Sequence, residues 1–494
     1  MCLAIVLAAL TQGVLMEEKS FVFDFTKETS NRINVDLPLQ ADLSKADAVS
    51  WEMKTDGLDG VMSLAMFFKS GPGWYSFGRL PELETDWDRL TVPCRDFSQQ
   101  MNPSGLDKID GFRIYVEIYP HARRRPITVT LRGLGTAALP PTAKARTFEQ
   151  DNPAALAYMK KCRGKAGERR LAWCHSAFGM GQGKTWDETA AYVRRNGFTD
   201  LIVNLSWSGL AYYDSKVLPV YSERSSRGDQ LKLALAACRK QGLKLHAWHV
   251  CYQFPEWTKD PAVQALKDKV VAENRSFQIE HEGRMTTWMC PSDRRNQRHI
   301  ARAMVELAEL GVDGIHFDYI RHRDSQNCCC PNCQTRFREK YGEDRSRWED
   351  FRQSHIDTVV RAVARKVREE HPEIEISAAV QAHWWAMAQN WPRWCNEGWV
   401  DFVCPMDYTH VDYLFRTQIR SQRGELKSGC KAKIYPGIGL TSSFNWPQDG
   451  RDAERLAKKI EIVREEGFEG FTVFNLVPRF TRLMPLMRES ILRP

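Results

Sequence analysis

The segment Gly311-Val-Asp-Gly-Ile-His-Phe-Asp-Tyr-Ile-Arg321 is the most informative stretch of this 494-residue chain. It has the pattern of a short buried strand that ends in a carboxylate, Asp318, with aromatic and charged side chains directly after it. Polar residues at the carboxyl ends of parallel strands mark the functional face of an α/β barrel. The segment therefore predicts one strand of such a barrel and a site at its mouth.

Apolar strands alternate with amphipathic helical stretches throughout residues 170–494. The predicted strands span 171–175, 200–204, 243–249, 314–318, 375–380, 400–404, 433–438 and 471–475. The predicted helices span 186–196, 229–241, 293–310, 348–370, 413–426 and 452–466, with a short one near Pro392. Eight strands with intervening helices are the count of a (β/α)8 TIM barrel with enlarged loops. A doubly wound open sheet is the competing fold, but it does not explain why polar residues gather at the strand ends.

Residues 18–137 have a different pattern. Short, often alternating strands separated by Gly, Pro and Asp turns predict an all-β antiparallel sandwich. The order of these strands resembles the jelly-roll, galactose-binding-like modules attached to carbohydrate-active enzymes. Two roles are therefore left as alternatives for residues 18–137, a sugar-binding module and a packing domain. A stretch rich in Pro, Ala, Lys and Arg over residues 138–169 predicts a linker with one short helix.

The net charge and the N-terminal sequence indicate which partners and which compartment to expect for this chain. The net charge of +8 is spread thinly, with basic and acidic stretches side by side, which predicts no nucleic-acid partner. The apolar run within residues 1–17 has signal-peptide length and is too short to span a bilayer. We therefore expect a secreted or periplasmic protein without a membrane span, with an ordinary apolar tail as the alternative. The oligomeric state is left open.

Most of the 14 cysteines lie in apolar runs, where a thiol packs as a small hydrophobic group. The exception is Cys328-Cys-Cys-Pro-Asn-Cys333. Its Cys330-x-x-Cys333 spacing fits a local disulfide, free thiols, or half of a four-thiolate zinc site. Zinc would need Cys328 or Cys329 to fold back, or a thiol from elsewhere in the chain. We expect a disulfide staple, and we predict no metal ligands and no cofactor.

Two carboxylates follow predicted strands four and six, Asp318 and Asp407. Glycoside hydrolysis uses one ionised carboxylate at the anomeric carbon and one protonated carboxyl group at the leaving oxygen. These two strands are close enough around a barrel for both groups to face one substrate. The alternative for either residue is structural, as a helix cap or a partner of Arg321. Pairing with Arg321 would keep Asp318 ionised, as a nucleophile requires.

Further polar and aromatic side chains are expected at the same mouth, because sugar rings stack on aromatic rings. The predicted substrate-binding residues are His316, Arg321, Tyr408, Gln381, Asn475, Asn204, Trp207, Trp248, His249 and Trp384. For a histidine in this set, a satisfied core position is the competing interpretation.

The segment 311–321, together with Cys404-Pro-Met-Asp-Tyr408, Tyr435-Pro-Gly-Ile-Gly439 and Asn396-Glu-Gly-Trp-Val-Asp401, resembles glycosyl-hydrolase-like family ten. The resemblance covers residues 170 to 480. It implies a (β/α)8 barrel distantly similar to the alpha-amylase superfamily. It also implies a glycan substrate, cleavage of O-glycosidic bonds, and Asp318 as nucleophile or stabiliser.

Two positions depart from the amylase pattern. His316 stands where amylases keep an arginine, and strand five runs into Val380-Gln-Ala-His-Trp384 without the glutamate that is their proton donor. Asp407 is therefore predicted as general acid/base from its position alone. A non-catalytic glycan-binding barrel is one alternative, and a transglycosylase or lyase is another.

Overall fold

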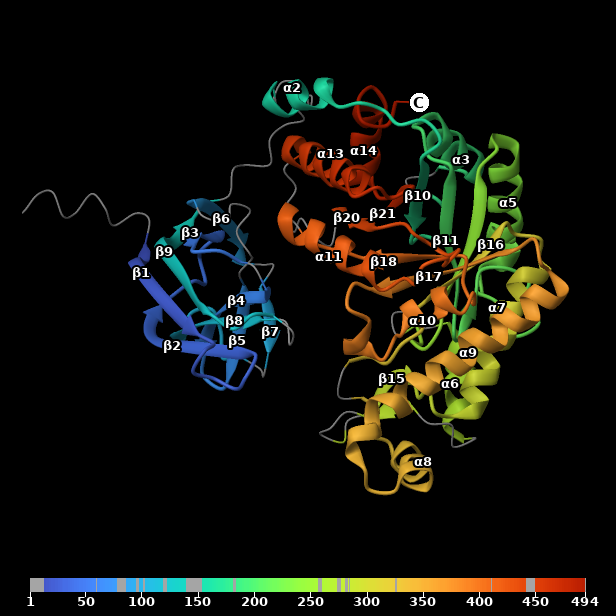
Figure 1. Cartoon of the computed structure of the whole chain (residues 1–494), viewed down its shortest axis with the longest axis horizontal. Coiled ribbons are helices and arrows are strands. Elements are labelled where there is room, and N and C mark those ends of the chain that lie inside the picture. Colours follow the sequence, from blue (N-terminus) through green and yellow to red (C-terminus); the bar gives the residue numbers. More distant parts are fainter. Residues whose placement is uncertain are drawn as a thin grey trace, which may run out of the picture. The chain divides into compact units, whose positions relative to one another are not determined.

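The computed structural model describes residues 13–493, except 59, 78–85, 95–96, 101–102, 119–121, 139–152, 181–183, 256–259, 273–276, 280–282, 284, 325–326, 410 and 441–448. The chain divides into two compact units, one mainly in the first 147 residues and one in the rest (Figure 1). Each unit has a hydrophobic core of its own. No described helix is long and apolar enough to cross a membrane.

The first unit is a sandwich of two antiparallel sheets, as predicted. Its described strands are β1 (Val14–Asp24), β2 (Arg32–Ala41), β3 (Ala48–Thr55), β4 (Val61–Ser70), β5 (Gly73–Phe77), β6 (Asp88–Pro93), β7 (Ser98–Gln100), β8 (Ile109–Ile118) and β9 (Pro126–Ala137). One sheet has the order β1-β9-β3-β6 and the other β2-β8-β4-β5-β7. Alternate residues of β8, such as Ile114, share one core with Phe23 and Trp51 of the opposite sheet.

The described part of the second unit forms a closed barrel of eight parallel strands. Its strands are β10 (Arg169–Cys174), β11 (Asp200–Trp207), β13 (Lys244–Val250), β16 (Gly314–Asp318), β17 (Glu375–Gln381), β18 (Phe402–Met406), a seventh split into β19 (Lys433–Ile434) and β20 (Gly437–Gly439), and β21 (Gly470–Phe474). Neighbours pair in chain order, and β10 pairs with both β11 and β21, which closes the sheet. The predicted (β/α)8 barrel is confirmed, and the open sheet is excluded.

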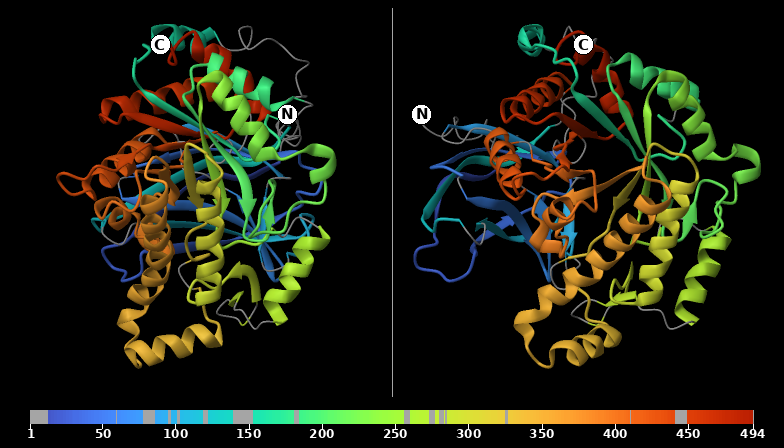
Figure 2. Two further views of the ribbon diagram at one scale, coloured as in Figure 1. Left: turned by 90° about the vertical axis from the view of Figure 1, so that its right-hand side faces the viewer. Right: turned by 45° about the vertical axis from the view of Figure 1, so that its right-hand side comes forward.

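Helices surround these strands, as both views of Figure 2 show. They are α3 (Trp186–Arg195), α5 (Gln230–Gln241), α6 (Pro261–Ala272), α7 (Arg294–Glu309), α8 (Pro331–Tyr341), α9 (Trp348–Glu370), α10 (Trp391–Asn396), α11 (Asp412–Gly424), α13 (Asp449–Glu465) and α14 (Pro478–Arg488), with the short α2 (Pro153–Lys161) before the barrel and α4 (Arg224–Arg227) after β12. The prediction missed α6, α8 and α14. Each of these begins with a proline, which the first helical turn tolerates.

Smaller elements extend the loops at the carboxyl ends of the strands. They are the short strand β12 (Leu210–Ala211), the hairpin β14 (Phe277–Ile279) with β15 (Met285–Met289), and the 3-10 helices η2 (Arg345–Arg347) and η3 (Trp384–Met387).

Alternation along the barrel strands separates interior side chains from helix-facing ones. In β18, Phe402 and Cys404 belong to the apolar cluster inside the barrel, whereas Val403 belongs to the core between strands and helices. In β16, Ile315 and Phe317 belong to that outer core. The same alternation decides where polar side chains at the strand ends point.

An ionic layer closes the barrel interior at the amino ends of the strands. Arg169 of β10 donates to Asp200 of β11 at 2.6 Å and to Glu375 of β17 at 2.7 Å. The Nε2 atom of His246 lies 3.0 Å from Asp200. Burial opposes ionisation of Asp200, but the hydrogen bonds from His246 and Arg169 outweigh it and lower the pKa of that carboxyl group.

Candidate active site at the barrel mouth

Asp318 is the last residue of β16 and is 4% exposed. Because Ile315 and Phe317 face the helices, Asp318 shares the interior face with His316. Its Oδ1 atom accepts a hydrogen bond from the backbone N–H of Tyr319 at 2.6 Å. The carboxylate therefore lies inside the barrel at the carboxyl end of the fourth strand.

The protonation of Asp318 is set mainly by its surroundings. Burial raises the pKa of Asp318 to about 7, although the Arg321 guanidinium, the Tyr319 N–H and the Trp248 indole all act to lower it. Arg321 thus stabilises the anion less than the sequence led us to expect. Near neutral pH the two protonation states of Asp318 are similarly populated.

Tyr319 turns the chain sharply after the carboxylate. Its φ of 50° lies in the left-handed region, which a non-glycine residue seldom occupies. The turn places its ring 5.1 Å from the Trp288 ring and 6.5 Å from the Trp207 ring. The Arg321 guanidinium lies 4.7 Å from the Tyr319 ring centre and 5.1 Å from that of Trp288. These four side chains form a packed wall beside Asp318.

His175 and Trp248 continue this aromatic lining. His175 directly follows β10 and is exposed, and its ring lies 5.5 Å from the Trp248 ring and 6.2 Å from the Trp207 ring. Trp207 and Trp248 belong to the cluster inside the barrel. Trp384, on η3 after β17, is half-buried. Such rings offer flat apolar faces to a sugar.

Amide side chains add polar groups to the barrel. Asn204 is buried on β11, and among the described residues neither polar atom of its side chain has a hydrogen-bond partner. The Oδ1 atom of Asn475, directly after β21, likewise lacks a partner in the described chain. A buried polar group without a partner costs about 1–3 kcal/mol, so water or a ligand hydroxyl is favoured at both positions. Gln381 ends β17 and is partly exposed.

Asp407 lies in a different environment. Asp407 directly follows β18, on the same strand face as Val403, which points towards the helices. It is 1% exposed. Its Oδ1 atom accepts a hydrogen bond from Nε2 of Gln422, on α11, at 2.5 Å. Burial raises the pKa of Asp407 well above its usual range, against the lowering effects of Gln422 and Lys459, which is on α13. The contacts of Asp407 are therefore with the helix layer.

Tyr408, the next residue, is on the strand face that points into the barrel. Its ring stacks on Phe474 of β21 at 5.6 Å. Burial and then the nearby charge of Asp318 raise the pKa of Tyr408 well above its ordinary value. The charges of both Asp318 and Asp407 thus act on Tyr408, whereas among the described residues the hydrogen bonds of the two carboxyl groups go to different partners, the Tyr319 N–H and Gln422.

His316, predicted to bind substrate, has the contacts of a core histidine. Its Nε2 atom accepts a hydrogen bond from the Trp173 indole at 3.1 Å, and its Nδ1 lies 2.8 Å from the Ser377 hydroxyl. Burial lowers the pKa of His316 well below its usual value. The neutral ring therefore has both nitrogens engaged and forms part of the barrel core on the same strand face as Asp318.

His249 has one ring nitrogen engaged by a neighbouring strand. Its Nδ1 atom lies 2.8 Å from the Ser206 hydroxyl. Burial, with a small effect of His299 on α7, lowers the pKa of His249 to about 3. A substrate-binding role for either His316 or His249 stays a prediction. The contacts of His316 favour the core interpretation, whereas the buried Nε2 atom of His249 has no hydrogen-bond partner among the described residues.

Comparison with known proteins identifies the family. The model of the family described as "Glycosyl hydrolase-like 10" matches residues 184–438, just over half of the chain. The chain belongs to this family. The matched range runs from α3 to β20 and includes both Asp318 and Asp407.

Named relatives of this Glycosyl hydrolase-like 10 protein are distant. The glycosyl hydrolase DigH of Escherichia coli O6:H1 is 21% identical over 247 residues, which cover 44% of this chain and 56% of DigH. The DigH of Escherichia coli K12 is 20% identical over the same length. The chain thus spans about half the length of the curated relatives it matches.

Similar solved structures include two glycosidases. Alpha-L-fucosidase isoenzyme 2 from Paenibacillus thiaminolyticus is similar over 65% of this chain and 48% of that chain, with 13% identity and a TM-score of 0.44. A beta-galactosidase from the psychrophilic Marinomonas ef1 is similar over 65% and 59%, with 11% identity and a TM-score of 0.46.

The cysteine segment does not contain the expected disulfide. Cys290, Cys328, Cys330 and Cys333 are all buried free thiols, and their sulfur atoms lie within 4.8 Å of one another. The prediction of a disulfide staple is therefore wrong. Cys290 was not foreseen, because it lies 38 residues before Cys328 and its local sequence has no ligand spacing.

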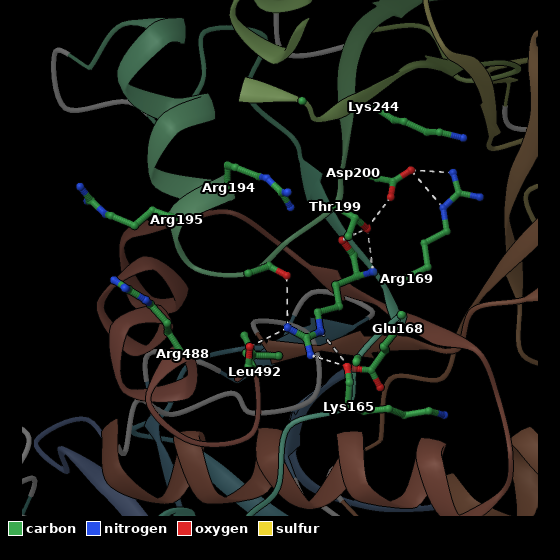
Figure 3. Close-up of a pocket in the computed structure, with 15 residues that line it drawn as sticks. Lys165, Glu168, Arg169, Arg194, Arg195, Thr199, Asp200, Lys244, Arg488 and Leu492 are labelled. Carbon is green, nitrogen blue, oxygen red and sulfur yellow. Dashed lines mark hydrogen bonds and ion pairs between the residues drawn. The ribbon is translucent and has the colours of Figure 1, made fainter. Parts of the chain in front are cut away.

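A large cavity of about 910 Å³ lies at the other end of the barrel (Figure 3). It is lined by the first residues of several strands and by Arg194, Arg195 and Arg488. Two of its arginines are engaged in the protein: Arg169 pairs with Asp200, and Arg170 pairs with Glu168 and donates to the backbone oxygen of Leu492. Polar groups at the amino ends of barrel strands serve stability, so this cavity is not the candidate active site.

Proposed function

We propose that the barrel cleaves O-glycosidic bonds of a polysaccharide or glycan strand, with Asp318 as its central catalytic residue. Membership in Glycosyl hydrolase-like 10 supports a glycan-acting hydrolase. The observation that carries the assignment is the buried Asp318 carboxylate, with a pKa raised by burial to about 7, at the carboxyl end of a barrel strand. The mouth of a barrel is where enzymes of this fold hold their reactive groups.

The surroundings of Asp318 suit a sugar ring. In the proposal, the ionised carboxylate attacks the anomeric carbon or stabilises the positive charge that develops there. The wall of Trp207, Trp288 and Tyr319 offers faces for the apolar side of the ring. Asn204, which has no partner in the described chain, is placed to hydrogen-bond a hydroxyl group.

The second role predicted from the sequence, a proton donor at Asp407, has weaker support. Its raised pKa gives it the proton that a donor needs, but its contacts are with Gln422 and Lys459 in the helix layer. We therefore propose that Asp407 positions Tyr408 against Asp318 and does not touch the substrate.

The variant Asp407→Asn separates the two roles. If Asp407 positions Tyr408, kcat falls by no more than about tenfold, whereas loss of a general acid typically costs about 10²–10⁴-fold. Circular dichroism and the melting temperature of the variant control for folding. A loss as large as that of Asp318→Asn in a folded variant, with activity restored on substrates that have an acidic leaving group, would establish Asp407 as the proton donor.

A non-catalytic glycan-binding barrel is the second candidate. The position of Asp407 favours it, because hydrolysis by two carboxylates needs a second group over the substrate. The purified protein should be incubated with peptidoglycan strands, chitin oligomers and α- and β-glucans, with products identified by mass. Cleavage that Asp318→Asn abolishes while glycan binding persists supports the hydrolase; binding without cleavage by the unaltered protein supports the second candidate.

Export of the chain and sugar binding by the sandwich stay predictions. Residues 1–12 lie outside the described part, and β1 begins at Val14, inside the expected signal segment 1–17.

A further inference from the structure

We propose that Cys290, Cys328, Cys330 and Cys333, hereafter the thiol cluster, bind one structural zinc ion as four thiolates. The ligands come from two places. Cys290 directly follows β15, and the other three lie at the start of α8 or in the loop before it. The sequence offered two ways to complete a zinc site, and the structure has both, since Cys328 folds back and a distant thiol joins.

The distances between the sulfur atoms match tetrahedral zinc. Zinc–sulfur bonds of about 2.3 Å in a tetrahedron place the sulfur atoms about 3.8 Å apart. The Sγ atoms of Cys290 and Cys330 are 3.8 Å apart, and all four lie within 4.8 Å of one another. A disulfide would bring two of them to about 2.05 Å.

The local backbone stabilises anionic sulfur. Cys330 is the N-cap of α8 and accepts the N–H of Cys333 at 3.4 Å, and its own N–H donates to Sγ of Cys328 at 3.5 Å. The positive end of the helix dipole favours negative charge at this position. Next to the cluster, the Ser292 hydroxyl lies 3.2 Å from Sγ of Cys290 and accepts a hydrogen bond from Arg336 at 3.0 Å.

The site is closed, which indicates a structural ion. All four cysteines are at most 2% exposed and pack with Phe337 and Phe351 in a small core of their own. Four protein ligands complete the coordination of structural zinc, whereas a catalytic zinc keeps a position open. On binding, each thiol releases its proton to solvent and its sulfur donates a lone pair to the metal, with no change of oxidation state. Soft thiolates select zinc over calcium or magnesium.

The second cluster of potential metal ligands, Asp200, His246 and Glu375, differs because it is already paired with a cation. Arg169 donates to both of its carboxylates, so a cation already neutralises them. The thiols of the cluster instead contact one another, the backbone at the start of α8 and the Ser292 hydroxyl.

The proposed ion would support the barrel mouth. Cys290 is two residues after Trp288, and Cys328 is seven residues after Arg321. Trp288 and Arg321 are two of the three groups that pack on Tyr319 beside Asp318. Zinc would therefore fasten together the hairpin and the loop that carry this wall.

Metal analysis of the intact protein, purified without added metal or chelator, tests the proposal. We expect about one zinc per chain in the unaltered protein, and loss of most of it in Cys290→Ser and Cys333→Ser. Cys329→Ser is the matched control, because this thiol lies in the same segment and outside the cluster. It should retain its zinc. Exchange with Co²⁺ should give the intense visible absorption of tetrahedral cobalt thiolate in the unaltered protein and in Cys329→Ser.

A chelation experiment covers the case in which the serine variants fail to fold. Removing metal from the unaltered protein should lower its melting temperature, and one equivalent of zinc should restore it. Three results would overturn the proposal: no bound metal together with an unchanged melting temperature after chelation, one equivalent of iron in place of zinc, or a mass two hydrogens lower that identifies a disulfide within the cluster.

Discussion

At the scale of single residues, burial of the ionised Asp318 carboxylate opposes the stability of the folded protein. Its pKa is raised from an ordinary value near 4 to about 7 in the folded chain, so folding favours the protonated form. The stabilising contribution of this group is fully present below pH about 4, and it is lost as the pH rises towards 7. Above that pH the folded protein holds a buried anion.

The variant Asp318→Asn should therefore be more stable than the unaltered protein at pH 8, because the amide carries no charge to bury. The gain should shrink steadily as the pH is lowered from 7 to 4. Thermal melting of both proteins across this range is the measurement. A destabilised variant at pH 8 would show that Arg321 stabilises the anion more than burial opposes it.

The pH dependence of catalysis follows from the same group. If Asp318 acts as the nucleophile or stabiliser, it must be ionised, and kcat/KM should rise with pH through an apparent pKa near 7. A profile that instead falls through this value would assign Asp318 the role of proton donor. Steady-state rates on any substrate found in the glycan screen decide between the two.

The sequence placed Asp318 and Tyr408 at the ends of strongly apolar strands, and the structure has them there. It could not assign His316 or His249, since the same residue type at a strand end serves either a ligand or the core. The contacts that bear on the question, from Trp173 and Ser206, come from other strands. Neighbouring residues of a strand point to opposite faces. For Asp407, the sequence pattern did not show whether the side chain points into the barrel mouth or towards the helix layer.

At the scale of elements, strand β16 depends on a glycine. A Cβ atom at Gly314 would lie 2.2 Å from Nδ1 of His246 and 2.9 Å from the backbone oxygen of Glu375. One neighbour is main chain and the other is a fully buried ring, so neither can move away easily. Close approach at this position lets β16 fit between its neighbours β13 and β17.

The variant Gly314→Ala should lower the free energy of unfolding by about 1–3 kcal/mol, the usual effect of overpacking. The control is Gly424→Ala at the end of α11, where nothing lies within 4 Å of the added carbon. Urea unfolding monitored by tryptophan fluorescence compares the two. Equal stability of both variants would contradict the crowding described for β16.

Two of the elements that the sequence did not predict, the hairpin β14–β15 and helix α8, share a physical reason. The hairpin β14–β15 packs in part on the small thiol-cluster core and in part on the main core, and the apolar residues of α8 pack on the small core. Their stability comes from contacts between segments far apart in the chain, which local periodicity does not report. The long, strongly amphipathic helices α7 and α9 were predicted correctly for the opposite reason.

At the scale of the whole molecule, the barrel is closed by an ionic layer as well as by its apolar core. Arg169 joins β10 to β11 and to β17 on the opposite side of the barrel. Removing one partner of a buried ionic network leaves the others without compensation, which typically costs about 3–5 kcal/mol. The carboxyl groups of Asp200 and Glu375 have lowered pKa values, so their contribution is present above pH about 4 and is lost as the pH falls further.

The variant Arg169→Met should destabilise the protein by about 3 kcal/mol at pH 7. The difference from the unaltered protein should become smaller below pH 4, as the carboxylates are protonated. Arg113→Met is the control, because Arg113 pairs with Asp36 at a partly exposed site on the sandwich and should contribute at most about 1 kcal/mol. Equal effects of the two variants would contradict a structural role for the ionic layer.

Digestion of glycans in ¹⁸O-labelled water shows whether this barrel hydrolyses glycosidic bonds through Asp318. Glycans incubated with the unaltered protein should yield products that carry one ¹⁸O atom at the new reducing end, and Asp318→Asn should yield none. Products without the label, or labelled products at an unchanged rate from Asp318→Asn, would contradict the account.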